Sequence, residues 1–327
     1  MIKVVVSSPK SRIERYGIKP PEGFELVYIN NPYTEDELIE KSKDATFLFL
    51  SLSPASRNVI NKLKTVKLIQ SEGAGYDGID TEAAKEAGIY VCNASGVNKV
   101  AVAEHTIGLI LASLRRTVEA DRQIKKGNFE ENYRDYEVRG MRELQSCHIG
   151  LVGLGNIGKE VVKRLKPFNC KISYYDPFRK PIDVETDLGI DYLPLGEILR
   201  KCDVISLHVP LMPETENLIN KDTINLMRKD AILINTARGG IINQEDLARA
   251  LIENRIEGAA VDTISPQPPH PEHPLLNLPE EAASKLILTT HIAGITTEAF
   301  KKMQIIAWNN MIKVLNGEKP DNIVNGL

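Results

Sequence analysis

The chain has 327 residues, of which 42% are hydrophobic and 26% charged, which is typical of a globular protein of about two domains. Its formal net charge is -3, and its Lys and Arg residues are scattered, which argues against a nucleic-acid partner. The apolar start at Met1–Ser8 is too short for a signal peptide, and no apolar stretch is long enough to cross a bilayer. We therefore expect a cytoplasmic protein with no membrane partner.

The cysteines give no sign of a metal site or of a disulfide framework. Cys92, Cys147, Cys170 and Cys202 are widely spaced and form no CxxC pair, and three of them lie in or beside apolar runs. We predict buried, reduced thiols and no bound metal.

The N-terminal part alternates short apolar runs with segments of helical spacing. The runs predict strands at Lys3–Ser7, Glu25–Ile29, Ala45–Leu50, Val66–Gln70 and Ile89–Cys92. The segments between them predict helices at Thr34–Lys43, Arg57–Leu63 and Asp80–Ala87. This alternation predicts a parallel sheet with helices on both faces.

A long helical stretch from about Asn98 to Lys126, followed by a polar loop through Gly140, leads to a second unit of the same kind. Strands are predicted there at His148–Val152, Lys171–Tyr175, Val204–Val209, Ala231–Asn235, Gly258–Asp262 and Leu286–Thr290. A further helical stretch, Glu298–Leu315, is long enough to return to the first unit. A small ligand is expected between two such units.

The most informative stretch is a glycine pattern that follows a predicted strand and opens a helix. Gly153 permits the tight strand-to-helix turn, Gly155 lets the backbone approach a pyrophosphate, and Gly158 lets helix and strand pack closely. The free N–H groups and the positive dipole end of the helix N-terminus suit phosphates. The pattern predicts a dinucleotide site.

An acidic residue at the end of the next strand indicates which dinucleotide binds. Asp176 lies 18 residues after Gly158 and can accept hydrogen bonds from the adenosine ribose hydroxyls. Its charge repels a 2′-phosphate, so the sequence favours NAD over NADP. Arg179 nearby weakens this preference, because a flexible loop can bring it toward a phosphate.

Ligands of open α/β sheets bind at the carboxyl ends of the strands, so the polar residues that follow each strand are candidates for chemistry. In the second unit these are His208, Arg238, Asp262, Gln267 and His291. Arg238 can fork onto a carboxylate and polarise a carbonyl, and histidine is the usual proton donor near neutral pH. Arg238 and His291 together suit a 2-oxo acid.

The sequence resembles the D-isomer-specific 2-hydroxyacid dehydrogenases over nearly its whole length. The matching stretches are Gly73–Asp80, Asn98 with Val102–His105, Gly153–Gly158, Leu207–Leu211 with Pro213–Thr215, Asn235–Gly239, Gly258–Asp262 and Thr290–Gly294. The resemblance implies an α/β fold of two doubly wound parallel-sheet domains. A Rossmann NAD domain (residues 99–292) is expected to be inserted into a flavodoxin-like substrate domain (residues 1–98 and 293–327).

The resemblance also implies roles. Arg238 would clamp the substrate carboxylate and carbonyl, and His291 would exchange a proton with the substrate oxygen. Ala74 and Gly75 would meet the carboxylate through their N–H groups, with Asn98 close by. The NAD-binding residues would be Val102, Gly153, Gly155, Asn156, Ile157, Gly158, Asp176, His208, Val209, Pro210, Thr215, Thr236, Ala237, Arg238, Asp262 and Gly294. A homodimer formed through Asn98–Lys126 is expected.

One position departs from the hydroxyacid dehydrogenase pattern. Gln267 stands where those enzymes have a glutamate that pairs with the catalytic histidine. A glutamine can orient the imidazole but cannot stabilise its charged form. Formate dehydrogenases of the same superfamily carry such a Gln–His pair, and Asn98 fits their formate-contacting asparagine, whereas Ala74 is smaller than their residue.

The sequence therefore leaves three functions open. The leading one is reduction of a 2-oxo acid to the D-2-hydroxy acid by NADH, and its reverse. The others are NAD-dependent formate oxidation and a non-enzymatic, NAD-sensing corepressor-like role, since one fold hosts several functions.

Overall fold

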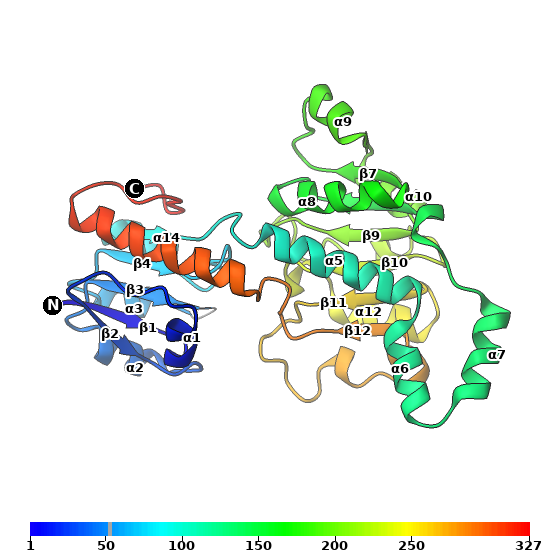
Figure 1. Cartoon of the computed structure of the whole chain (residues 1–327), viewed down its shortest axis with the longest axis horizontal. Helices are drawn as coiled ribbons and strands as arrows, with labels where there is room; N and C mark the ends of the chain where they lie inside the picture. Colours follow the sequence, from blue (N-terminus) through cyan, green and yellow to red (C-terminus); the bar gives the residue numbers. More distant parts are fainter. Residues whose placement is uncertain (52–53) are drawn as a thin grey trace. The chain divides into compact units, whose positions relative to one another are not determined.

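The computed structural model describes residues 1–51 and 54–327, in two compact units (Figure 1). The first unit contains Met1–Asn98 and Ile295–Leu327, and the second contains Lys99–Gly294. In the described part of the chain, no helix has both the length and the apolar character needed to span a membrane.

The first unit is a five-stranded parallel sheet in the order β2-β1-β3-β4-β5. Its strands are β1 (Ile2–Val6), β2 (Phe24–Tyr28), β3 (Phe47–Leu50), β4 (Leu68–Ser71) and β5 (Tyr90–Cys92). Its helices are α1 (Lys10–Arg15), α2 (Glu35–Ser42), α3 (Arg57–Lys62), α4 (Thr81–Glu86) and α14 (Thr297–Leu315). This strand order is that of flavodoxin-like folds.

Alternating side chains give this sheet two separate cores. Leu48 and Leu50 of β3 pack with residues of α2, α3 and α4 on one face. Phe47 and Phe49 pack on the other face with residues of α1 and α14, among them Trp308. Helices thus cover both faces, as the strand–helix alternation predicts, and Figure 1 shows α14 lying along this sheet.

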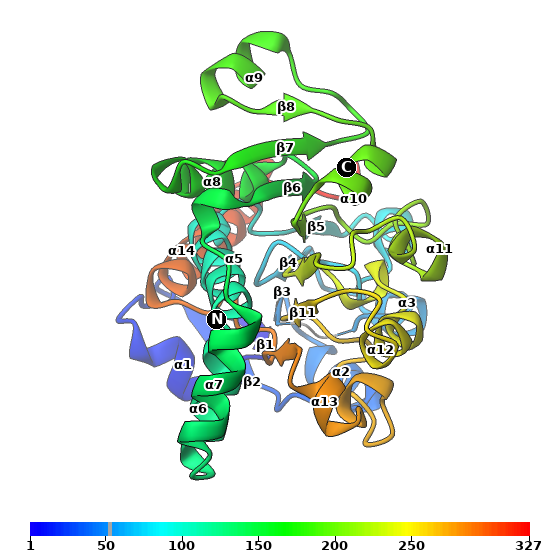
Figure 2. The same cartoon turned by 90° about the vertical axis from the view of Figure 1, so that its right-hand side faces the viewer.

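The second unit is a seven-stranded parallel sheet in the order β12-β11-β10-β9-β6-β7-β8 (Figure 2). Its strands are β6 (His148–Val152), β7 (Lys171–Tyr175), β8 (Asp191–Tyr192), β9 (Val204–Leu207), β10 (Ile232–Asn235), β11 (Gly258–Val261) and β12 (Leu286–Leu288). The order extends the Rossmann arrangement by one strand. The short strand β8 was not predicted, because two residues carry no readable periodicity.

Helices again cover both faces of this sheet. Helices α5 (Lys99–Leu114) and α8 (Asn156–Leu165) share one core with Ile149 and Ile234. Helices α10 (Leu195–Lys201), α11 (Lys221–Ile224), α12 (Gln244–Ile252) and α13 (Glu280–Ala283) share the other core. This unit also contains α9 (Ile182–Leu188) and the 3-10 turns η1 (Leu144–Ser146), η2 (Lys166–Phe168), η3 (Gly239–Ile241) and η4 (Pro274–Leu276).

The prediction of one helix to Lys126 and a polar loop to Gly140 was wrong. Helix α5 ends at Leu114, Arg116 has a left-handed φ of 48°, and two further helices follow, α6 (Thr117–Lys125) and α7 (Phe129–Arg139). Helix α7 is polar on most of its surface, and the i,i+4 pairs Glu130–Arg134 and Asp135–Arg139 lie along it. None of its residues is buried, and a helix that is mostly polar gives only a weak periodic signal.

Candidate active site

The glycine pattern forms a turn between β6 and α8 that a side chain would obstruct. Gly153 has a φ of +101°, and a Cβ there would lie 2.7 Å from the carbonyl oxygen of His208. A Cβ on Gly158 would lie 2.5 Å from the Gly153 oxygen. Gly155 has open space around its Cβ position. Strand and helix therefore pack as closely as predicted, and the open side is left for a ligand.

The N-terminus of α8 suits an anion. No side chain caps it, and no acidic residue lies in its first turn, which begins at Asn156 and Ile157. Its N–H groups and dipole are thus available to a pyrophosphate placed over Gly155. These residues fit the diphosphate of a dinucleotide.

Asp176 is a buried carboxylate at the end of β7 that is tied to the glycine turn. Its oxygens accept the N–H groups of Leu154 at 2.9 Å and Phe178 at 3.0 Å, and Lys180 lies 3.1 Å away. Burial alone would raise the pKa of Asp176, but these donors hold that pKa below its ordinary value. The group is therefore a fixed negative charge at the adenosine end of the predicted site.

The loop that follows β9 carries His208, Val209, Pro210 and Thr215. Burial lowers the pKa of His208 to about 4, so its imidazole is neutral near pH 7, and Nε2 lies 2.9 Å from Ser206 Oγ. The Thr215 hydroxyl donates to the Pro210 carbonyl at 2.6 Å and accepts the Met212 N–H at 2.8 Å. The predicted cofactor residues of this loop thus form one hydrogen-bonded turn.

The loop that follows β10 is shaped by Asn235, which the sequence reasoning did not single out. Its side chain accepts the Ala237 N–H at 3.0 Å and donates to the Arg238 carbonyl at 2.9 Å. The Thr236 hydroxyl lies 2.9 Å from that of Thr106, which donates to the carbonyl of Val102. Strand β10 therefore ends in a braced turn that fixes the backbone of Arg238.

Gly239 lets the next loop come close to Arg238. A Cβ on Gly239 would lie 2.6 Å from the backbone of Ile264 and 2.7 Å from that of Ser265. Ser265 is anchored in turn by Gln244, which exchanges two hydrogen bonds with its backbone, and by His273, 3.0 Å from its carbonyl. Neither partner was predicted: Gln244 lies 21 residues from Ser265, and the eight-residue spacing of His273 follows no periodic pattern.

His291 follows β12 in a left-handed conformation with a φ of 56°. Its N–H donates to the carbonyl of Asp262, whose fully buried carboxylate accepts the N–H groups of Ile292 and Ala293 at 2.9 and 3.0 Å. Thr289 also donates to this carboxylate. Asp262, predicted as a cofactor residue, therefore holds the backbone of His291, Ile292 and Ala293, directly before the predicted Gly294.

The Gln267 and His291 side chains are in contact. Gln267 Oε1 lies 2.8 Å from His291 Nδ1, so the amide oxygen accepts the Nδ1 proton. This contact fixes the tautomer, with Nε2 as the nitrogen that can exchange a proton with a ligand. Arg238, Gln267 and His291 lie in the loops that follow the adjacent strands β10, β11 and β12, at the carboxyl ends of these strands.

Ala74 and Gly75 follow β4 in the first unit. The Ala74 carbonyl accepts from Asn93 at 2.7 Å, and the Gly75 carbonyl accepts from the hydroxyl of Ser71 at 2.5 Å. Asn98 directly precedes α5. The carbonyls of this loop are thus bound within the first unit, and its action on a substrate carboxylate stays a prediction.

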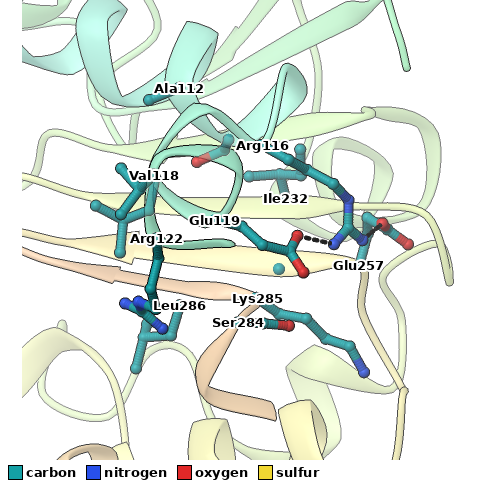
Figure 3. Close-up of a pocket in the computed structure, with 13 residues that line it drawn as sticks. Ala112, Arg116, Val118, Glu119, Arg122, Ile232, Glu257, Ser284, Lys285 and Leu286 are labelled. Carbon is teal, nitrogen blue, oxygen red and sulfur yellow. Dashed lines mark hydrogen bonds and ion pairs between the residues drawn. The ribbon is translucent and has the colours of Figure 1, made fainter. Parts of the chain in front are cut away.

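A small cavity of about 30 Å³ lies at the amino ends of strands in the second sheet (Figure 3). It is lined by Ile232, Gly258 and Leu286, which begin β10, β11 and β12. The Arg116 guanidinium bridges Glu119 and Glu257 beside it. None of the predicted site residues lines this cavity, and its volume suits only one or two water molecules.

Comparison with known proteins agrees with this geometry. Residues 107–293 match the family described as D-isomer specific 2-hydroxyacid dehydrogenase, NAD binding domain. A glyoxylate reductase of Thermofilum pendens is 41% identical over 296 residues, which make up 90% of this chain and 85% of that protein. The chain belongs to the D-isomer specific 2-hydroxyacid dehydrogenases. This dehydrogenase is an oxidoreductase that binds NAD.

Two further similarities of this dehydrogenase widen the comparison. A D-3-phosphoglycerate dehydrogenase of Methanocaldococcus jannaschii is 38% identical over 327 residues, and the chain spans 60% of that relative's length. The solved structure of a formate dehydrogenase from Granulicella matches with a TM-score of 0.88 at 26% identity, over 98% of this chain and 97% of that one.

Proposed function

We propose that this dehydrogenase reduces a small 2-oxo acid to the D-2-hydroxy acid with NADH, and catalyses the reverse oxidation. The observation that carries the proposal is the placement of Arg238, Gln267 and His291 on three adjacent strand ends of the NAD domain, with Gln267 bound to His291. A guanidinium and an oriented imidazole are the two groups that a 2-oxo acid needs, one for its carboxylate and one for its oxygen.

Each residue has one task in this reaction. When bound, NADH supplies the hydride that adds to C2 of the 2-oxo acid. Arg238 holds the substrate carboxylate and polarises its carbonyl, which keeps C2 in a reactive position. Nε2 of His291 gives its proton to the carbonyl oxygen as negative charge develops there. The Nδ1–H bond to Gln267 keeps the ring in place, and Ala74, Gly75 and Asn98 contact the carboxylate.

A substrate panel tests the proposal. Glyoxylate is the first candidate, because a relative bears the name glyoxylate reductase, followed by hydroxypyruvate, pyruvate and formate, each with both nicotinamide cofactors. We expect NADH oxidation with at least one 2-oxo acid, and a D-configured product wherever the product is chiral. NADH binding without turnover of any of them would favour the corepressor-like role instead.

Formate oxidation is the second candidate, because the partner of His291 is the neutral amide of Gln267, at the position where the hydroxyacid dehydrogenases have a glutamate. Formate gives up a hydride to become carbon dioxide without transferring a proton, so a pair with no carboxylate suits it. NAD reduction by formate, together with no turnover of the 2-oxo acids, would establish this candidate.

Gln267→Glu tests the orienting role of the amide. A carboxylate at this position stabilises the imidazolium, which is the proton-donating form in the reductive direction. We expect the upper pH limit of 2-oxo acid reduction to move upward by about one pH unit. Steady-state kcat/KM between pH 5 and 10 measures this, with Gln145→Glu, the same change at an exposed position of η1, as the comparison. A profile that does not move would show that residue 267 does not influence the proton donor.

We further propose that the dehydrogenase forms a homodimer and that the interface extends beyond the predicted Asn98–Lys126 stretch into α7. Helices α6 and α7 form a hairpin that projects from the sheet of the second unit (Figures 1 and 2). Phe129 and Tyr133 stack at 6.1 Å between ring centroids, yet each is 55% exposed, and Val138 is 86% exposed. Such apolar surface on a projecting hairpin indicates a contact with a second copy.

Replacing both Phe129 and Tyr133 by Glu should convert the dimer into a monomer. Each copy would then bury two carboxylates at the interface, opposite those of the second copy. Their desolvation and mutual repulsion oppose association. Light scattering during size-exclusion chromatography measures the mass, with Ile252→Glu as a control at another exposed apolar position (49% exposed). A double variant that keeps the mass of the unchanged protein would place the interface elsewhere.

A further inference from the structure

Arg179, three residues beyond Asp176, is directed toward Glu185, although its side chain is 57% exposed. Its Nε and one Nη each donate to the carboxylate of Glu185 at 2.9 Å, in a two-pronged contact. Its guanidinium also lies 5.0 Å from the ring centroid of Tyr192 on β8. The sequence suggested that a flexible loop could bring Arg179 to a phosphate, whereas in the structure Glu185 in α9 and Tyr192 contact it from two sides (Figure 2 shows α9 and β8 together).

The surroundings of Glu185 favour its ion pair with Arg179. Only 4% of the residue is exposed, and it accepts a third hydrogen bond from the hydroxyl of Tyr174 at 2.6 Å. The same hydroxyl accepts the N–H of Lys180 at 2.9 Å. The donors Arg179 and Tyr174 lower the pKa of Glu185 to about 2, so its negative charge persists at every working pH.

The ion pairs on this loop leave no positive charge uncompensated there. Lys180 pairs with Asp176, and Arg179 pairs with Glu185. A 2′-phosphate carries about two negative charges near pH 7 and binds most strongly to a guanidinium whose donors face it. With Arg179 turned toward Glu185, no guanidinium is directed at the predicted ribose site, and the ammonium of Lys180 is paired with Asp176 itself.

We propose that Glu185 is a cofactor-selectivity residue: by holding Arg179 away from the adenosine ribose, it keeps this dehydrogenase selective for NAD over NADP. Asp176 repels the 2′-phosphate, and Glu185 removes the cation that would otherwise attract it. The proposal concerns dinucleotide binding alone, so it stands whatever the substrate of the enzyme is.

The test compares the dissociation constants of NADH and NADPH for Glu185→Gln, measured by calorimetry without substrate. Glutamine keeps the shape of the side chain but loses the charge that retains the guanidinium. We expect NADPH to bind about tenfold more tightly relative to NADH than it does to the unchanged protein, because one charge-assisted contact becomes available to the 2′-phosphate. The NADH dissociation constant should change by less than about twofold.

A second variant identifies the cation. In the double variant Arg179→Gln/Glu185→Gln, the relative gain in NADPH binding should disappear. Glu197→Gln is the matched control, because Glu197 also pairs with basic side chains, Arg200 and Lys201, but on the exposed face of α10. It should leave the ratio of the two constants unchanged.

Two results would overturn the proposal. One is an unchanged ratio in Glu185→Gln when its melting temperature shows a folded protein, and the other is a gain that persists in the double variant, which would assign the effect to Lys180. Should Glu185→Gln fail to fold, Arg179→Gln alone decides: the proposal expects no change in the ratio, and weaker NADPH binding would show that Arg179 already contacts the 2′-phosphate.

Discussion

Replacing Arg238 by Gln should lower kcat/KM for reduction of the 2-oxo acid by about a thousandfold, with little change in the dissociation constant of NADH. The loss combines a missing carboxylate clamp with weaker stabilisation of the developing oxyanion, and removing one such donor alone typically costs 10²–10³ in rate. The turn braced by Asn235 should keep the backbone of residue 238 in place, because its hydrogen bonds involve main-chain groups.

Two further variants sharpen this experiment. Arg238→Lys keeps the charge but not the planar fork, so it should recover only part of the activity. Arg249→Gln, in the last turn of α12, is the control and should leave kcat/KM unchanged. If Arg238→Gln retained most of its activity, the carboxylate would have to be held by another group.

His291→Asn should lower kcat by about a thousandfold, within the 10²–10⁴ range of general acid–base catalysis. Asparagine is the informative replacement, because the φ of 56° at this position is one that asparagine tolerates well. The variant should therefore keep the loop that Asp262 organises while removing the proton donor. Activity that remained should no longer show the limb of the pH profile that belongs to the imidazole.

The control for this variant is His270→Asn, an exposed histidine of the loop that also carries Gln267. It should keep both kcat and the pH profile. A His291→Asn enzyme that oxidised formate at an undiminished rate would favour the formate reaction, because that reaction requires no proton transfer.

The sequence was most informative where the type and spacing of the residues allow a single structural interpretation. The glycines of the β6–α8 turn and the apolar runs of the larger strands gave the fold and the dinucleotide site, since sterics and periodicity are local properties. Two elements escaped for the same reason: β8 has only two residues, and the few apolar residues of α7 are exposed among charged ones.

The side chains that brace the site were not predictable in this way. Gln244 meets Ser265 across 21 residues, and Asp262 meets Ala293 across 31. No local pattern reports such pairs, because the fold alone decides which loops become neighbours. Glu185 lies only six residues from Arg179, yet nothing in the spacing tells a buried partner from an exposed one.

The backbone of Ile264 and Ser265 lies so close to Gly239 that it limits which residues can replace this glycine. Any side chain there would push against Ile264 and Ser265 and so displace the segment that carries Gln267. An alanine at this position would thus misalign the imidazole while leaving every reacting group in the sequence intact. Relatives that had acquired such a change would still display the full set of signature residues and yet be poor catalysts, so inheritance of the motif alone does not guarantee inheritance of the activity.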